Sequence, residues 1–209
     1  EIYTKDVKDF PNIHFDRHLY LPLLKSDRRV KSTPPALNEG EAKFVTDLRS
    51  FLQAHGSEFE DKEVFLLRNL ARGKGLGFFD PGEGEAFYPD FILWVLQDRQ
   101  QWIAFIDPHG LRMARGGFHD PKVRLREYLK ALEPRLQQEL KDRQQGGCGP
   151  GEVHLTSFIL STSPFEEIRK TFGTGQHSKE EFKEHNILFM EDDQYIAKLF
   201  QKLLDETDV

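Results

Sequence analysis

Two aspartates, Asp90 and Asp107, have a spacing that could place them side by side. Asp90 lies near the start of one apolar segment, residues 87–96, and Asp107 ends the next one, residues 102–107. Both segments are rich in aromatic and branched side chains and predict β-strands, and the polar stretch 97–101 between them predicts a hairpin turn. Facing residues of a hairpin are equally far from the centre of its turn. The midpoint between the aspartates falls inside the polar stretch, so their carboxylates are predicted to face each other at the open end of the hairpin.

Binding of a divalent cation is the chemistry that two facing carboxylates favour. Opposed Cα atoms lie roughly 4.5–5.5 Å apart, so oxygens of both side chains can reach one ion. Two like charges this close repel each other unless a cation or a proton joins them. Oxygen ligands of this kind are typical of Mg²⁺ or Mn²⁺. An aspartate at a strand end can also simply make a turn, and that alternative stays open.

Two residues after Asp107 extend this candidate site. The backbone carbonyl of Pro108 is a further candidate metal ligand. His109 lies two residues past Asp107, so in a continuing strand both side chains point to the same face. A donor at that position can contact an attacking water or a phosphate oxygen.

Helices are predicted on both sides of this hairpin in the sequence. The first begins at Asn38, which can form a capping box with Glu41, and ends near Gly56. Its apolar side chains recur at helical spacing. The other predicted elements are a strand or short helix at 63–70, a helix at 122–144, a strand at 153–160, a helix at 165–172, a strand at 187–190 and a helix at 194–204.

This order of elements predicts an α/β domain with a mixed sheet. Because both hairpin segments are almost entirely apolar, the hairpin is predicted to lie at the centre of the sheet and to be buried on both faces. We expect the domain to span residues 38–209. Residues 1–37, which four prolines punctuate, are predicted to form an irregular lead-in that wraps the domain or links it to an upstream one.

The composition limits the function. The 209 residues carry a formal net charge of −6, so any surface for nucleic acid must be local. Cys148 is the only cysteine, which excludes an internal disulfide and fits the reducing cytoplasm. No apolar run approaches the roughly 20 residues of a membrane span. The chain begins at Glu1 rather than at Met, and we expect it to be a fragment of a longer protein.

The stretches Tyr88-Pro89-Asp90 and Phe105-Ile106-Asp107-Pro108-His109 resemble the bipartite motif of the PD-(D/E)xK nuclease superfamily. The resemblance covers roughly residues 35–160 and includes the order of the elements. It implies a restriction-endonuclease-like fold, with a mixed central sheet flanked by helices. It also implies a Mg²⁺- or Mn²⁺-dependent deoxyribonuclease in which Asp90 and Asp107 hold the metal ion.

The resemblance also implies an acidic residue on the first helix. Glu41 or Glu39 fits, and Glu41 is favoured because it lies one turn ahead of the apolar stripe. Glu41 would hold the ion through water or bind a second ion. Residues 34–45 are similar to the segment that precedes the nuclease domain of type III restriction-type enzymes, in which that domain follows a helicase motor. The implied partners are therefore DNA and a helicase/ATPase region, in restriction or phage defence, with a homodimer expected if both strands are cut.

The chain departs from the family pattern at position 109, where the usual lysine is replaced by His109. A displaced cation could compensate, and Arg112, Arg115 and Lys122 are the nearby candidates. Two alternatives remain open: a nuclease-like module that binds DNA or a protein without cutting, and a different metal-dependent hydrolase. Candidate contacts to the DNA backbone are Arg68, Arg72, Lys74, Arg112, Arg115 and Lys122, although residues 72–77 also fit a bare loop.

Overall fold

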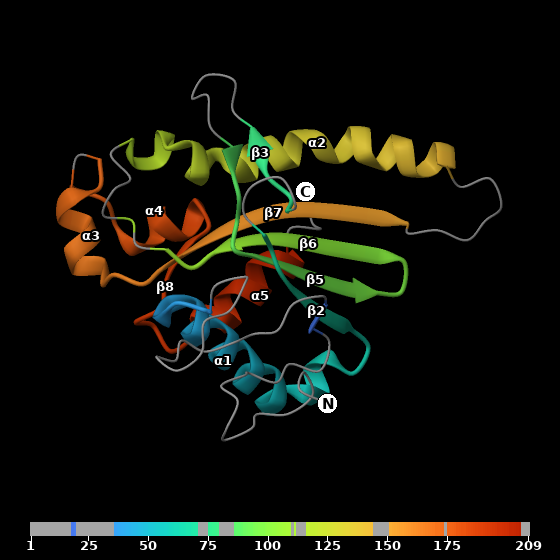
Figure 1. Ribbon diagram of the computed structural model, residues 1–209, viewed down its shortest axis with the longest axis horizontal. Coiled ribbons are helices and arrows are strands. Elements are labelled where there is room, and N and C mark those ends of the chain that lie inside the picture. The colour runs from blue at the N-terminus through green and yellow to red at the C-terminus, as the bar shows by residue number, and fades with distance from the viewer. Residues whose placement is uncertain are drawn as a thin grey trace.

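A six-stranded mixed sheet in the order β1-β2-β5-β6-β7-β8 forms the centre of the computed structural model (Figure 1). β5 pairs antiparallel with β2 and β6, whereas β7 runs parallel to β6, β8 parallel to β7 and β1 parallel to β2. The strands are β1 (His18–Leu19), β2 (Glu63–Arg68), β5 (Phe91–Gln97), β6 (Gln100–Asp107), β7 (Glu152–Ser161) and β8 (Ile187–Phe189). The structure describes residues 18–19, 36–70, 75–79, 86–109, 111, 116–143, 151–173 and 175–205.

Helices cover both faces of the sheet, with α1 and α5 on one side and α2 on the other (Figure 1). Phe44 of α1 and Leu199 of α5 share one core cluster, while Leu129 of α2 packs with Phe105 of β6 on the opposite face. The helices are α1 (Glu39–Ala54), α2 (Pro121–Arg143), α3 (Phe165–Thr171), α4 (Lys179–Glu184) and α5 (Tyr195–Asp205), with 3-10 turns at Gly56–Phe59 and Gly117–His119. The predicted α/β class, with a mixed central sheet flanked by helices, is confirmed. Among these helices none is long and apolar enough to cross a membrane.

The central hairpin has the predicted register. Phe91 pairs with Ile106 and Gln97 pairs with Gln100, around a turn at residues 98–99. Asp98 occupies this turn with a φ of 52°, a conformation that Asp tolerates better than most residues. Extending the register by one residue beyond Phe91 places Asp90 opposite Asp107. The hairpin is also central in the sheet and largely buried, as its apolar sequence predicts.

The two faces of the hairpin meet different helices because side chains alternate along a strand. Phe91 and Ile106 face α1 and α5, whereas Ile92 and Phe105 face α2. Asp107 follows Phe105 by two residues, so its side chain lies on the face that α2 covers. This alternation directs the acidic end of the hairpin toward the first turn of α2.

Three features of the fold differ from the sequence-based prediction. Phe87 does not belong to the hairpin strand but to β4 (Ala86–Phe87), which pairs with β3 (Phe78–Phe79) in a small separate sheet. Pro89 separates the two strands, since proline lacks the N–H that a sheet ladder needs. In the lead-in, β1 adds an edge strand to the large sheet. Leu37, one residue before the expected domain start, is 1% exposed in the core.

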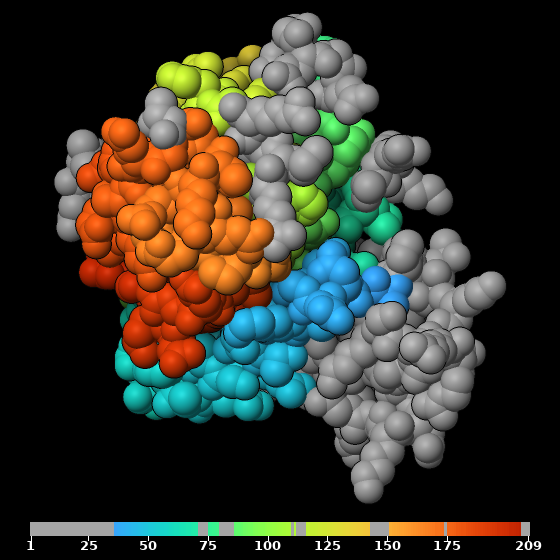
Figure 2. Space-filling model, turned by 90° about the vertical axis from the view of Figure 1, so that its left-hand side faces the viewer, coloured from blue at the N-terminus to red at the C-terminus, as the bar shows by residue number. Residues whose placement is uncertain are grey.

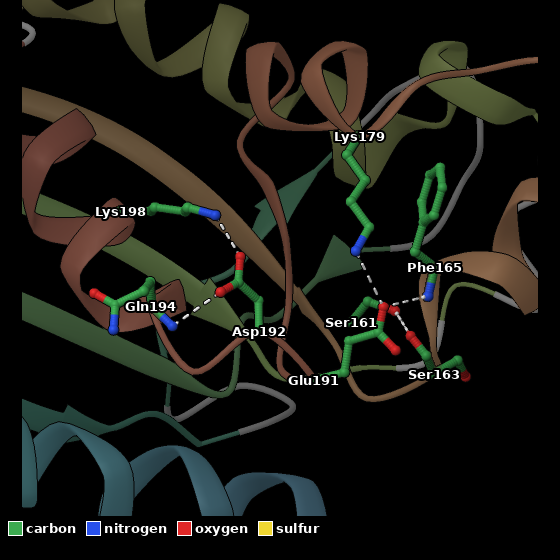
Figure 3. Close-up of polar contacts among 8 residues, drawn as sticks. All are labelled: Ser161, Ser163, Phe165, Lys179, Glu191, Asp192, Gln194 and Lys198. Carbon is green, nitrogen blue, oxygen red and sulfur yellow. Dashed lines mark hydrogen bonds and ion pairs between the residues drawn. The ribbon is translucent and has the colours of Figure 1, made fainter.

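Two acidic residues of the loop after β8, Glu191 and Asp192, contact the helices α3, α4 and α5 (Figure 3). Glu191 accepts a hydrogen bond of 3.0 Å from the backbone N–H of Phe165, the first residue of α3, and lies 3.6 Å from Lys179 of α4. Asp192 accepts a hydrogen bond of 2.9 Å from the N–H of Gln194 and pairs with Lys198 of α5. The acidic residues therefore act on helix starts, including that of the last helix.

α4 was not predicted, although its sequence carries a start signal. The Ser178 hydroxyl accepts a hydrogen bond of 3.2 Å from the N–H of Glu181, whose carboxylate accepts one of 2.7 Å from the N–H of Ser178. This capping box begins a helix of six residues. So short a segment has too few positions to display an apolar stripe, and the box was the only available signal.

Candidate functional site

Asp90 and Asp107 lie together where the central hairpin opens, at the end of the sheet where β7 and β8 also finish. Asp107 is the last residue of β6 and is 5% exposed. Its carboxyl group is hydrogen-bonded to that of Asp90. Burial first, and then the charge of Asp107 and this hydrogen bond, raise the pKa of Asp90 to about 8. A carboxyl pair of this kind requires a shared proton or a cation near neutral pH.

Asn69, a residue that sequence analysis missed, fixes the backbone at Asp90. The Asn69 N–H donates to the carbonyl of Asp90 at 2.8 Å, and the Asn69 side-chain amide donates to the carbonyl of Pro89 at 2.8 Å. The same amide group also exchanges hydrogen bonds with the backbone of Leu76, at 2.8 and 3.0 Å. Asn69 thus joins the end of β2 to the Pro-Asp segment. Its position directly after a strand is the only sequence signal for this role.

Among the described residues, Lys122 is the cation in contact with the acid pair. Its Nζ lies 3.3 Å from Oδ2 of Asp107 and 4.7 Å from the centre of the Phe87 ring. Its charge acts against the elevation of the Asp90 pKa. The first turn of α2 holds Lys122 in place, because Oδ1 of Asp120 accepts a hydrogen bond of 3.0 Å from the Lys122 N–H.

Glu41 lies near the pair but is engaged elsewhere. It forms the predicted capping box with Asn38, in which the Glu41 N–H donates to Oδ1 of Asn38 at 2.8 Å. Its Oε2 also lies 3.4 Å from Nη2 of Arg68, and both side chains are nearly buried. Glu41 further raises the pKa of Asp90 through its charge. In the described part of the chain, no three His, Cys, Asp or Glu side chains converge where they could hold one metal ion.

The remaining predicted site residues divide into three groups. His109 is exposed, and its backbone N–H donates to the carbonyl of Leu160 at 3.1 Å, which holds the segment after β6 against β7. Arg68 is turned toward Glu41, and burial lowers its pKa while the charges of Glu41 and Asp90 oppose that shift. Four other cations of the candidate DNA surface lie outside the described residues: Arg72, Lys74, Arg112 and Arg115.

Gly40 allows the first turn of α1 to approach the site closely. A Cβ at this position would lie 2.5 Å from Cγ2 of Thr162 and 3.5 Å from the carbonyl oxygen of Pro108. In Figure 2 the blue end of α1 lies against the orange residues that follow β7. The carbonyl of Pro108, a predicted metal ligand, is therefore near the first turn of α1.

The donor set fits Mg²⁺ or Mn²⁺. Asp90, Asp107 and the Pro108 carbonyl offer only oxygen atoms, and the repulsion between the two carboxylates favours a cation between them. Mg²⁺ is commonly bound through one or two carboxylates and completes its shell with water and substrate phosphates. Metal binding by Asp90, Asp107 and the Pro108 carbonyl, and by Glu41 through water, stays a prediction.

Fold and site together define an α/β domain in which the buried Asp107 and the partly buried Asp90 form an acid pair at the open end of the central hairpin. No protein-family model matches the chain, and neither a curated protein nor a solved structure matches it. The function is therefore argued from the site itself.

Proposed function

We propose that this chain is a metal-dependent nuclease domain that hydrolyses phosphodiester bonds of DNA, with Asp90 and Asp107 as metal ligands. The observation that carries the proposal is the acid pair. Two carboxyl groups at the end of an apolar hairpin are hydrogen-bonded to each other, and the pKa of Asp90 is raised. Such an arrangement costs folding free energy when both groups are charged, and binding a cation removes that cost.

The reaction is hydrolysis without oxidation or reduction. The oxygen of one water bonds to phosphorus, one P–O ester bond breaks, and the leaving oxygen takes up a proton. A bound Mg²⁺ or Mn²⁺ supplies polarisation of the phosphate, a lower pKa of water and an opposite charge for the leaving oxygen. Asp90 gives up its proton on metal binding, and the Pro108 carbonyl adds a neutral oxygen. Glu41 would hold the ion through a water or bind a second ion, as the resemblance implies.

The DNA substrate and the cellular setting rest on the resemblance to PD-(D/E)xK nucleases. With a net charge of −6, contact with DNA must come from local cations such as Lys122. We further propose that the domain works with a helicase or ATPase region in the cytoplasm, in restriction or phage defence. Cutting both strands would suit a homodimer, since each copy carries one acid pair.

A cleavage assay tests the proposal. Supercoiled plasmid and single-stranded DNA would be incubated with Mg²⁺ or Mn²⁺ and with wild type, Asp90→Asn or Asp107→Asn. We expect the wild type to cut and each variant to lose about 100-fold or more of the rate. Asp98→Asn makes the same chemical change at the opposite end of the hairpin, where Asn also tolerates the positive φ, and should cut as the wild type does.

The alternatives give different results in the same experiment. A wild type that binds DNA, cuts nothing and shows no thermal shift with Mn²⁺ is a binding module. A wild type that Mn²⁺ stabilises but that neither binds nor cuts DNA is a different metal-dependent hydrolase. Cleavage that survives both aspartate substitutions would rule out the acid pair as the active site.

A further inference from the structure

We propose that Lys122 is the cation that acts on the substrate phosphate at this site. It would take the role of the lysine that the nuclease motif usually has where this chain has His109. The inference rests on the proposed nuclease function and adds a catalytic residue to it. It depends on the position of Lys122, whose ammonium group reaches Asp107 from a different element of the fold.

The surroundings of the Lys122 ammonium leave one side free for a substrate. Its Nζ lies 3.3 Å from Oδ2 of Asp107, and the side chain of Asp107 is 7% exposed whereas that of Lys122 is 41% exposed. The ring of Phe87 supports the ammonium at 4.7 Å. An ammonium has three N–H donors, so contact with Asp107 leaves donors for a phosphate oxygen. Lys122 thus stands between the buried acid and the solvent from which DNA must approach.

The residue in the usual lysine position is placed differently. His109 is exposed, and its ring makes no hydrogen bond or ion pair with the described residues. Arg68, the other described cation near the pair, lies 3.4 Å from Glu41 and its side chain is 11% exposed. Neither therefore combines contact with the acid pair and access to solvent as Lys122 does.

The proposed role is electrostatic. The Lys122 ammonium donates a hydrogen bond to a non-bridging oxygen of the phosphate, where negative charge grows during attack by water. Because Lys122 and a bound metal ion would share Asp107, the attraction between the ammonium and that carboxylate is weaker in the metal-bound state. The ammonium is then available to the phosphate.

A comparison of Lys122→Ala, Lys122→Arg and His109→Ala tests this role, with Lys130→Ala as the matched control. Lys130 lies two turns further along α2, and its half-exposed side chain pairs at 3.2 Å with Glu133. We expect Lys122→Ala to lower kcat about 100-fold, Lys122→Arg to restore part of that loss and Lys130→Ala to cut as the wild type does. The loss from His109→Ala should be at least about tenfold smaller than that from Lys122→Ala. Circular dichroism would establish that each variant is folded.

A second readout does not depend on cleavage. Titration with Mn²⁺ in the absence of DNA should give a Kd about threefold or more lower for Lys122→Ala than for the wild type, because a competing positive charge is gone. Lys130→Ala should leave the Kd unchanged. An unchanged Kd in Lys122→Ala would show that the ammonium does not act on the metal ligands and would overturn the inference.

The results separate this inference from the proposed function. If the wild type cuts DNA and Lys122→Ala cuts it equally well, or if His109→Ala lowers the rate more than Lys122→Ala does, the role of Lys122 is refuted. The proposed nuclease function is unaffected by either result. A wild type that cuts no DNA refutes the nuclease, and the substrate role of Lys122 with it.

Discussion

Arg68 and Glu41 connect the end of β2 to the first turn of α1 through an ion pair of 3.4 Å between Nη2 and Oε2. The pair lies on the face of the sheet that α1 covers, whereas Lys122 and Asp107 meet on the face that α2 covers. Each of the two faces thus contributes one cation and one acid at the same end of the sheet. Asp90 senses both groups, because Glu41 raises its pKa and Lys122 lowers it.

Removing the charge of Arg68 should destabilise the protein. Both side chains of the ion pair are nearly buried, so Arg68→Met leaves Glu41 as an unpaired charge in a poorly solvated position. We expect a loss of about 2–4 kcal/mol in the free energy of unfolding, measured by urea denaturation. The double variant Arg68→Met/Glu41→Gln should recover part of it, since Gln keeps the capping box without the charge. A double variant no more stable than Arg68→Met would contradict the ion-pair explanation.

The acid pair should make stability depend on pH. The pKa of Asp90 is raised from its ordinary 3.8 to about 8, so the folded state holds a proton that the unfolded state releases between these values. The contribution of this group to stability is present below pH 4 and is lost as the pH rises through 8. In EDTA, Asp90→Asn should therefore be about 1–2 kcal/mol more stable than the wild type at pH 9.

Two controls accompany this pH experiment. The difference between Asp90→Asn and the wild type should shrink toward pH 5, and added Mn²⁺ should stabilise only the wild type. Asp98→Asn, at the far end of the hairpin, should follow the wild type at every pH. Equal stability of Asp90→Asn and the wild type across the range would mean that the two carboxyl groups do not repel each other in solution.

Asn69 should matter for both stability and metal binding. Asn69→Ala removes three side-chain hydrogen bonds, two with the backbone of Leu76 and one with that of Pro89. The backbone groups that made these bonds lose their partner. We expect a loss of about 1–3 kcal/mol by thermal or chemical unfolding. Because Pro89 precedes a metal ligand, Mn²⁺ should also bind more weakly in calorimetry. A variant that loses stability but keeps the wild-type Kd would limit Asn69 to a structural role.

Asn186 offers a separate test of backbone conformation. Asn186 is 1% exposed with a φ of 56°, and its side-chain amide donates to Oγ1 of Thr156 at 2.9 Å. Both substitutions lose the hydrogen bond, but Asn186→Gly removes the Cβ, whereas Asn186→Ala keeps a Cβ in the left-handed region without the polar side chain that lets Asn tolerate it. We expect Ala to be about 1 kcal/mol less stable than Gly. The reverse order in urea denaturation would show that this turn changes its conformation in the variants.

The central hairpin could be predicted because its register follows from sequence positions alone, and Asp90 and Asp107 are as far from the turn as Phe91 and Ile106 are. Long helices such as α2 were found because their apolar stripes span several turns. The contact between Lys122 and Asp107 could not be derived, since it depends on the direction in which α2 crosses the sheet. The hydrogen bonds from Asn69 to Pro89 and Asp90 depend in the same way on the pairing of β2 with β5.

The packing of α1 against α5 has a consequence for synthesis on the ribosome. Tyr195 donates from its hydroxyl to Oδ2 of Asp47 at 2.8 Å, across a separation of 148 residues. Five residues of α5 are buried, and all five belong to the core cluster beneath α1. While the chain is being translated, α5 cannot cover the apolar side of α1 until α5 has emerged from the exit tunnel. The nascent domain therefore exposes the core cluster beneath α1 until α5 is made, and this interval is when a chaperone would bind it.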